Sequence, residues 1–236
     1  MLAGRRQVFV RTYGCNLRCT YCDSPETLRE TPSPAFCRVE TQSGSGRFCT
    51  IPNPVSLHTL THTVQSFLHE PHHSLSLTGG EPLLQARFWQ CWLPQTAGWN
   101  LPVFLETNGM LPAHLQMVLP YISLVSMDYK APSATGMPYE KSRDLQREFL
   151  QVASARQVYM KLVVTPHTSM EELDCAVQLL NEVYPIPALI LQPVTPCGYE
   201  TEPVQAQKLF AMHAHASRAL PDVRIIPQLH KAMHLL

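Results

Sequence analysis

The chain has 236 residues, 45% of them hydrophobic, which is enough for one large domain with a sizeable core. Its 18 basic residues balance its 18 acidic ones, and this excludes the broad positive surface that bulk nucleic-acid binding requires. No run approaches the roughly 18 consecutive apolar residues of a membrane span. We therefore expect no nucleic-acid partner, no membrane partner and a small-molecule substrate.

The eight cysteines bear on the compartment of the protein. The start, Met1-Leu-Ala-Gly-Arg-Arg6, lacks the apolar core of a secretion signal. Cysteines in a protein without such a signal meet a reducing environment, where clustered thiols indicate a metal site or catalysis rather than disulfides. We expect a cytoplasmic protein.

A predicted strand at 7–11 leads directly into three closely spaced cysteines, Cys15, Cys19 and Cys22, with the spacing C-x3-C-x2-C. Three thiolates so close together suit an iron–sulfur cluster that lacks one protein ligand, which leaves one iron open for chemistry. A structural zinc site is the alternative. It usually shows a second Cys or His pair downstream, and no such pair follows closely here.

Residues 30–55 are predicted to be irregular, with a possible hairpin in which 37–40 and 47–50 flank a Ser-Gly-Ser-Gly turn. The remaining chain alternates between β-branched runs and segments with helical spacing of apolar residues. Strands are predicted at 75–78, 103–107, 122–128, 158–165, 188–192 and 223–226. Helices are predicted at 55–70, 83–92, 113–119, 139–155, 169–183 and 203–219.

This alternation predicts an α/β fold, specifically an incomplete (β/α) barrel of the TIM type, with 1–236 as a single domain. In such folds functional residues gather at the carboxyl ends of the strands. The unusual residues of this chain follow its predicted strands: Cys15, Gly79-Gly80-Glu81, Glu106-Thr107-Asn108, Asp128-Tyr129-Lys130 and Gln192-Pro193.

The segment Thr78-Gly79-Gly80-Glu81-Pro82 is the second strong signal. Glycines at a strand end let backbone groups approach a ligand closely, and the neighbouring carboxylate can accept hydrogen bonds from a ligand ammonium group. A simple turn that closes the strand is an equally good interpretation of this motif alone.

Together, the two motifs resemble those of the radical S-adenosylmethionine (SAM) superfamily, whose members carry C-x3-C-x-aromatic-C, with Tyr21 at the aromatic position, and a Gly-Gly-Glu motif. The resemblance implies a [4Fe-4S] cluster on Cys15, Cys19 and Cys22. It also implies that SAM chelates the open iron and is cleaved to a 5′-deoxyadenosyl radical. The cofactors carry this chemistry, while the protein positions them.

Further motifs of the sequence resemble those of one family within this superfamily, 7-carboxy-7-deazaguanine synthase. The matching stretches occur in the family's order along nearly the whole chain: Arg11-x-x-Gly-Cys15, Thr78-Gly-Gly-Glu-Pro82, Glu106-Thr-Asn-Gly109, Lys130-Ala-Pro-Ser133, Leu191-Gln-Pro193 and Gln228-x-His230-Lys231. The resemblance implies that 6-carboxy-5,6,7,8-tetrahydropterin loses hydrogen from C6, contracts its ring and releases ammonia, with SAM regenerated. The product would serve queuosine-type transfer RNA modification or another deazapurine route.

The family match also implies roles for single residues. Arg11 and Thr78 match positions that hold the substrate, and Ser24 matches the residue whose hydroxyl binds Mg²⁺. The implied cofactor-binding positions are Tyr21, Asp23, Gly79, Gly80, Glu81, Asn108, Asp128, Tyr129, Lys130 and Gln192. A flavodoxin or ferredoxin as reductant and a homodimeric state are further expectations from the resemblance.

Two departures from the family pattern stand out. Many members have Ser-Pro-Lys where this chain has Asp128-Tyr129-Lys130, so we expect a different contact to the SAM ribose. The family also carries a strand and a Gln-Gly-Glu-Gly segment ahead of the position of Leu2, and this segment helps to bind the pterin. We expect either that Met1 is an internal methionine with the true start upstream, or that substrate binding differs.

Two other classes of function compete with the synthase. One is an activase of the same superfamily that forms a glycyl radical on a partner protein, and the other is a noncatalytic iron–sulfur or zinc protein. The five remaining cysteines, Cys37, Cys49, Cys91, Cys175 and Cys197, are expected to be free thiols. His58 and His62 could bind zinc, but a solvated helix flank is the expected role.

Overall fold

The computed structural model describes residues 2–28 and 34–233. Met1 and the first four residues of the predicted irregular segment, 30–33, lie outside the described residues. Among the described helices, none combines the length and the hydropathy that crossing a membrane requires.

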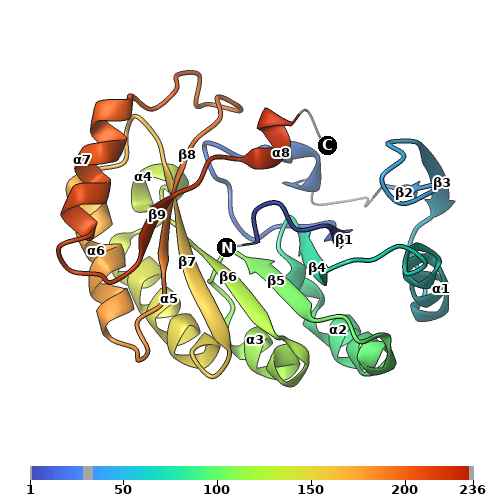
Figure 1. Ribbon diagram of the computed structural model, residues 1–236. Coiled ribbons are helices and arrows are strands. Elements are labelled where there is room, and N and C mark those ends of the chain that lie inside the picture. Colours follow the sequence, from blue (N-terminus) through green and yellow to red (C-terminus); the bar gives the residue numbers. More distant parts are fainter. Residues whose placement is uncertain (1, 29–33, 234–236) are drawn as a thin grey trace.

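A seven-stranded parallel sheet forms the centre of the molecule, with its strands in chain order, β1-β4-β5-β6-β7-β8-β9 (Figure 1). This arrangement confirms the predicted α/β fold and incomplete barrel. The strand bounds are β1 (Gln7–Thr12), β4 (Ser74–Gly79), β5 (Val103–Thr107), β6 (Leu124–Tyr129), β7 (Gln157–Val164), β8 (Leu189–Pro193) and β9 (Val223–Ile225).

Helices connect the strands and pack along one side of the curved sheet, whereas the cysteine loop and the C-terminal helix lie at the other side (Figure 1). The longer helices are α1 (Leu57–Phe67), α2 (Ala86–Trp92), α3 (Pro112–Val118), α5 (Tyr139–Ala153), α6 (Met170–Asn181) and α7 (Ala206–Ala216). Two helices of one turn, α4 (Pro132–Thr135) and α8 (Leu229–Ala232), were not predicted. The described part of the chain also contains four 3₁₀ segments: Pro25–Leu28, Pro82–Gln85, Leu93–Trp99 and Leu119–Tyr121.

A separate antiparallel hairpin follows the cysteine loop. Its strands are β2 (Phe36–Glu40) and β3 (Phe48–Pro52), with Val39 opposite Cys49. The tip of the hairpin contacts the main body through Ser43, whose carbonyl and hydroxyl oxygens both accept hydrogen bonds from the Arg6 guanidinium, at 3.1 and 3.0 Å.

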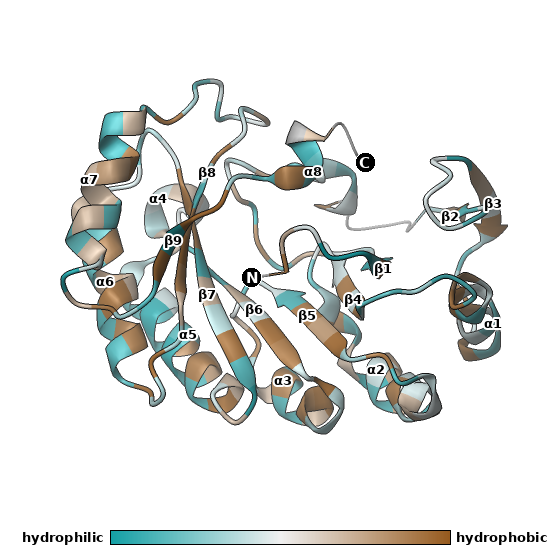
Figure 2. Ribbon diagram, in the orientation of Figure 1, coloured by the Kyte–Doolittle hydropathy of each residue, from teal (hydrophilic) through white to brown (hydrophobic). Residues whose placement is uncertain are grey.

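The main hydrophobic core lies between the sheet and its helices. Hydrophobic stretches run along the strands, and the helices are mixed (Figure 2). Leu77 and Leu105 of the sheet are fully buried there, as are Trp89 and Trp92 of α2. Ser169 begins α6 with a capping box, because its side chain and that of Glu172 each accept a backbone N–H of the other residue.

The inner face of the sheet carries a second, smaller cluster made by Phe104, Leu124, Tyr159 and Ile190. Side chains of a strand alternate between its two faces, so residues two positions further along point to the same side as this apolar floor. Those positions hold Glu106, Ser126, Lys161 and Gln192. The inner face therefore changes from apolar to polar toward the carboxyl ends of the strands.

Two glycines at the end of β4 allow the cysteine loop to lie directly on the sheet. A Cβ on Gly79 would lie 2.3 Å from the Thr12 carbonyl oxygen, and one on Gly80 would lie 2.1 Å from that of Gly14. The close approach is sealed by backbone hydrogen bonds from Gly80 N to Thr12 O at 3.1 Å and from Glu81 N to Gly14 O at 2.8 Å. The Gly-Gly pair thus fixes the start of the cysteine loop.

We predict that Gly80→Ala lowers the free energy of unfolding by about 3 kcal/mol or more, because the added methyl group overlaps backbone atoms that cannot move aside. Gly98→Ala is the matched control, since nothing lies within 4 Å of a Cβ at Gly98, and its effect should stay within about 0.5 kcal/mol. Urea unfolding followed by circular dichroism measures both. Equal stabilities for the two variants would contradict the proposed packing.

Candidate active site

The carboxyl ends of the parallel strands bring the predicted site residues to one edge of the sheet. Arg11 of β1 lies beside Thr78 of β4 in the strand register, and Asp128 of β6 lies beside Lys161 of β7. The Thr78 hydroxyl donates to Glu106 Oε2 at 2.9 Å, which links β4 to β5. Residues from five strands therefore share this edge.

The three cysteines lie in the loop after β1, and all three side chains are partly exposed. Burial raises the pKa of the Cys15 thiol, and burial likewise raises that of Cys19; the neighbouring cysteines raise both further. Because iron binds thiolates, filling the site must displace protons from these thiols.

The donor set fits an iron–sulfur cluster better than a single metal ion. Within residues 2–28 and 34–233, no three His, Cys, Asp or Glu side chains converge on one ion position. The three thiols are nevertheless near enough to influence one another electrostatically. A four-iron cluster is larger than one zinc ion and is held by more widely spaced thiolates. Cys15, Cys19 and Cys22 would hold it.

Glu81 joins the ends of β4 and β5. Its buried carboxylate accepts hydrogen bonds from Leu83 N at 3.0 Å, from the Thr107 hydroxyl at 2.8 Å and from Asn108 N at 2.8 Å. Burial raises the pKa of Glu81 to about 7, although the three donors oppose this shift. In this structure the carboxylate organises the strand ends, and its contact with a SAM ammonium group stays a prediction.

Asn108 connects β5 to the cysteine loop. Its side-chain amide donates to Asn16 Oδ1 at 2.7 Å, and its Oδ1 accepts from Met110 N at 3.1 Å. Asn16 lies between Cys15 and Cys19 and is not among the predicted site residues. A pairing across 92 positions leaves no local pattern that could have revealed it.

Asp128 carries the strongest charge cluster of the site. Its carboxylate lies 2.9 Å from Lys130 Nζ and 3.0 Å from Lys161 Nζ, and Lys130 Nζ also lies 5.3 Å from the centre of the Tyr21 ring. Burial alone would raise the pKa of Asp128, but the two ammonium groups hold it below its ordinary value. Burial would likewise lower the pKa of Lys130 and Lys161, and Asp128 raises both above the ordinary value.

Lys161 is a second residue that sequence reasoning missed. It sits within a β-branched run, where a single lysine gives no motif, and only the register opposite Asp128 places it in the site. With Arg11 and Lys130, it makes three cationic side chains at this edge of the sheet against the carboxylates of Glu106 and Asp128.

Tyr129 is not brought together with the other predicted cofactor residues. It alternates with Asp128 and Lys130 along the chain, so its buried side chain points to the helix side of the sheet. There it lies near Cys175 of α6. The pKa of Tyr129 is raised, mainly by burial and to a smaller extent by Cys175. Gln192 is half-buried at the end of β8, beside Val163 in the register.

The C-terminal segment folds back so that α8 lies beside the N-terminal part of the chain (Figure 1), and its residues contact Asp23 at the end of the cysteine loop. Gln228 Nε2 donates to Asp23 Oδ2 at 3.2 Å, and His230 Nε2 lies 3.8 Å from the same oxygen. The Ser24 hydroxyl donates to Asp23 Oδ1 at 3.3 Å. Burial lowers the pKa of His230, which favours a neutral imidazole at this position.

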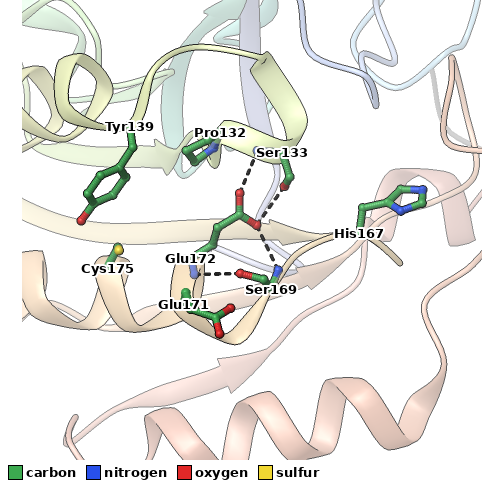
Figure 3. Close-up of a pocket in the computed structure, with 8 residues that line it drawn as sticks. All are labelled: Pro132, Ser133, Tyr139, His167, Ser169, Glu171, Glu172 and Cys175. Carbon is green, nitrogen blue, oxygen red and sulfur yellow. Dashed lines mark hydrogen bonds between the residues drawn. The ribbon is translucent and has the colours of Figure 1, made fainter.

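A cavity of about 460 Å³ lies outside this site, between α4, α5 and α6 (Figure 3). Glu172 accepts hydrogen bonds there from Ser133 N at 2.7 Å, from the Ser133 hydroxyl at 2.9 Å and from Ser169 N at 3.0 Å, so its carboxylate ties α4 to α6. No residue predicted to bind cofactor or substrate lines this cavity, and we assign it no part in the chemistry.

Comparison with known proteins agrees with this geometry. The family model described as "Radical SAM superfamily" matches residues 9–174. A solved structure titled "Structure of TYW1 with a lysine-pyruvate adduct bound" has the same fold, with a TM-score of 0.56, 11% identity and coverage of 90% of this chain and 72% of that one. The chain belongs to the radical SAM superfamily, and is an enzyme that uses a [4Fe-4S] cluster and SAM.

Curated relatives narrow the class. The 7-carboxy-7-deazaguanine synthase of Geobacter sulfurreducens is 39% identical over 99% of this chain and 91% of its own length. The synthase of Thermococcus kodakarensis is 32% identical over 99% and 90%, and that of Methanothermobacter thermautotrophicus is 30% identical over 100% and 92%. Within the superfamily, the chain therefore belongs to the 7-carboxy-7-deazaguanine synthase family.

The charge cluster generates a stability prediction. Asp128→Asn leaves two ammonium groups without their shared carboxylate and should lower the free energy of unfolding at neutral pH by about 3 kcal/mol. Since the folded-state pKa of Asp128 is depressed, its stabilisation is complete above the unfolded-state pKa and is lost as the pH falls through the lower folded value. The two proteins should therefore converge in acid.

Asp144→Asn is the control for this measurement, because Asp144 pairs with Arg143 and Arg147 on the surface and its side chain is 63% exposed. Such a pair contributes less than about 1 kcal/mol. Denaturant unfolding at several pH values measures all three proteins. An Asp128→Asn variant as stable as Asp144→Asn at neutral pH would refute the coupling of Asp128 to both lysines.

Proposed function

We propose that this protein converts 6-carboxy-5,6,7,8-tetrahydropterin to 7-carboxy-7-deazaguanine with loss of ammonia, as a cytoplasmic step of queuosine or related deazapurine synthesis. The observation that carries the proposal is the similarity to curated synthases over almost the whole chain. It favours a synthase over an activase that acts on a partner protein. When bound, the cluster and SAM supply the one-electron chemistry that starts hydrogen abstraction from the substrate.

Arg11 is the residue best placed to recognise the substrate carboxylate. It is exposed on the inner face of β1, and within the described part of the chain its guanidinium has no hydrogen-bond or ion-pair partner. A planar guanidinium binds a carboxylate through two parallel hydrogen bonds. Thr78 lies beside Arg11 in the strand register, and its hydroxyl donates to Glu106 on the next strand. Thr78 and Glu106 would orient the pterin ring through their hydroxyl and carboxylate oxygens.

Mg²⁺ is assigned to Ser24. A hard cation prefers oxygen ligands, and the Ser24 hydroxyl and the Asp23 carboxylate lie together beside the cysteine loop. Substrate oxygens would complete the coordination.

The residues proposed to surround SAM are Tyr21, Asp23, Gly79, Gly80, Glu81, Asn108, Asp128, Lys130 and Gln192. Tyr129 would act only from the helix side of the sheet. A flavodoxin or ferredoxin reductant, a homodimer and one catalytic domain complete the proposal.

An anaerobic turnover assay tests the function. Reconstituted protein is mixed with SAM, dithionite, Mg²⁺ and 6-carboxytetrahydropterin, and the product is detected by mass spectrometry. We expect many molecules of 7-carboxy-7-deazaguanine per SAM consumed. Cleavage of SAM without this product would support the radical chemistry but refute the proposed substrate.

Arg11 offers a sharper test of the substrate contact. Arg11→Met keeps the aliphatic length but removes the charge, so we expect KM for the pterin to rise by about 10- to 100-fold, as the loss of a charge-assisted hydrogen-bonded pair predicts. Arg87→Met, on the exposed surface of α2, should leave KM unchanged. Steady-state kinetics measure both. An unchanged KM in Arg11→Met would remove Arg11 from the substrate site.

A further inference from the structure

The loop between β8 and α7, residues 194–205, lies against the cysteine loop. Tyr199 N donates to Thr20 O at 2.9 Å, and the Thr20 hydroxyl donates to Glu200 Oε1 at 2.7 Å. The Cys197 thiol donates to Tyr21 O at 3.3 Å. Three hydrogen bonds thus join two segments that are about 180 positions apart in the sequence.

The segment that makes these contacts forms a turn that is fixed by its own backbone hydrogen bonds. Cys197 and Glu200 exchange backbone hydrogen bonds, with N to O distances of 2.8 and 3.0 Å. Gly198 between them has a φ of 61°, and a Cβ there would lie 2.8 Å from Thr20 O. Glu200 is only 5% exposed, so its carboxylate meets the Thr20 hydroxyl away from competing water.

Thr20 is also held from the opposite side, since its N–H donates to Ala134 O of α4 at 2.9 Å. Its N–H, C=O and hydroxyl groups are therefore all hydrogen-bonded to two segments, α4 after β6 and the loop after β8. Thr20 lies directly after Cys19 and two residues before Cys22. A shift of Thr20 would change the spacing of these two thiols.

We propose that Thr20, Glu200 and Cys197 are positioning residues that hold the Cys19–Cys22 turn in the shape the cluster and SAM require. Partners beyond the ligands themselves commonly fix ligand geometry in metal sites. This inference rests on the cluster in the proposed function and does not depend on the identity of the substrate.

The test compares three disruptive variants with two conservative ones and one control. Thr20→Val removes the hydroxyl and keeps the branched shape, Glu200→Ala removes its acceptor, and Cys197→Ala removes the thiol donor. Glu200→Gln keeps a carbonyl oxygen that can accept from Thr20, and Cys197→Ser keeps a donor for Tyr21 O. Glu202→Gln changes an exposed glutamate on the same loop and serves as the control.

Each protein is reconstituted anaerobically, and the rate of iron loss to a chelator is followed by the visible absorbance of the cluster. The dissociation constant of SAM is measured by equilibrium dialysis. Thermal unfolding of the cluster-free protein reports the fold. We expect Thr20→Val and Glu200→Ala to lose iron about tenfold faster and to bind SAM several-fold more weakly, the size expected for one charge-assisted hydrogen bond. Glu200→Gln keeps an acceptor without the charge, so it should lose iron no more than about threefold faster than the wild type. Cys197→Ser and Glu202→Gln should stay within about twofold of the wild type.

Iron loss and SAM affinity within twofold of the wild type in both Thr20→Val and Glu200→Ala would overturn the proposal. A fall in the thermal unfolding temperature that fully accounts for the faster iron loss would also overturn it. If either variant fails to fold, Cys197→Ala decides the question. We expect it to lose iron about threefold faster than the wild type. A rate equal to that of the wild type would contradict the proposal. A wild-type protein that holds no cluster would instead refute the proposed function.

Discussion

The structure depends on the contact between the end of β4 and the start of the cysteine loop. Gly79 and Gly80 leave no room for side chains there, so the backbone of Thr12 and Gly14 rests on the end of the neighbouring strand. This contact decides where Cys15 begins its loop, and the loop then meets Asn108, α4 and the segment after β8. Backbone packing therefore requires glycine at both positions, whether or not either residue also contacts a ligand.

The two faces of the sheet have different roles. Its outer face and the helices form the core that stabilises the fold, whereas its inner face carries an apolar floor and then charged groups toward the strand ends. The fold tolerates the Lys130–Asp128–Lys161 cluster because each charge has an opposite partner, and because Asp128 and Lys161 keep some contact with solvent. Arg11 has no such partner among residues 2–28 and 34–233, which agrees with the substrate-binding role proposed for it.

Local patterns in the sequence predicted the fold well. β-Branched runs located all seven strands of the main sheet. The three cysteines and Gly79-Gly80-Glu81 pointed to the edge of the sheet where the candidate site lies, and their binding roles stay predictions. Alternation also explains why Tyr129 turns away from its neighbours in the motif, and the short helices α4 and α8 are too brief for periodicity to show. Asn16, Lys161 and the Thr20–Glu200 pair could not be predicted, because strand register and contacts between distant loops place them.

We propose that this edge of the sheet holds a four-iron cluster with one iron open to SAM. Electron paramagnetic resonance of the reduced, reconstituted protein, recorded with and without SAM, tests it most directly. We predict the signal of a reduced [4Fe-4S] cluster, a change in that signal when SAM is added, and loss of both in Cys22→Ala. A cluster signal that SAM leaves unchanged would contradict the account.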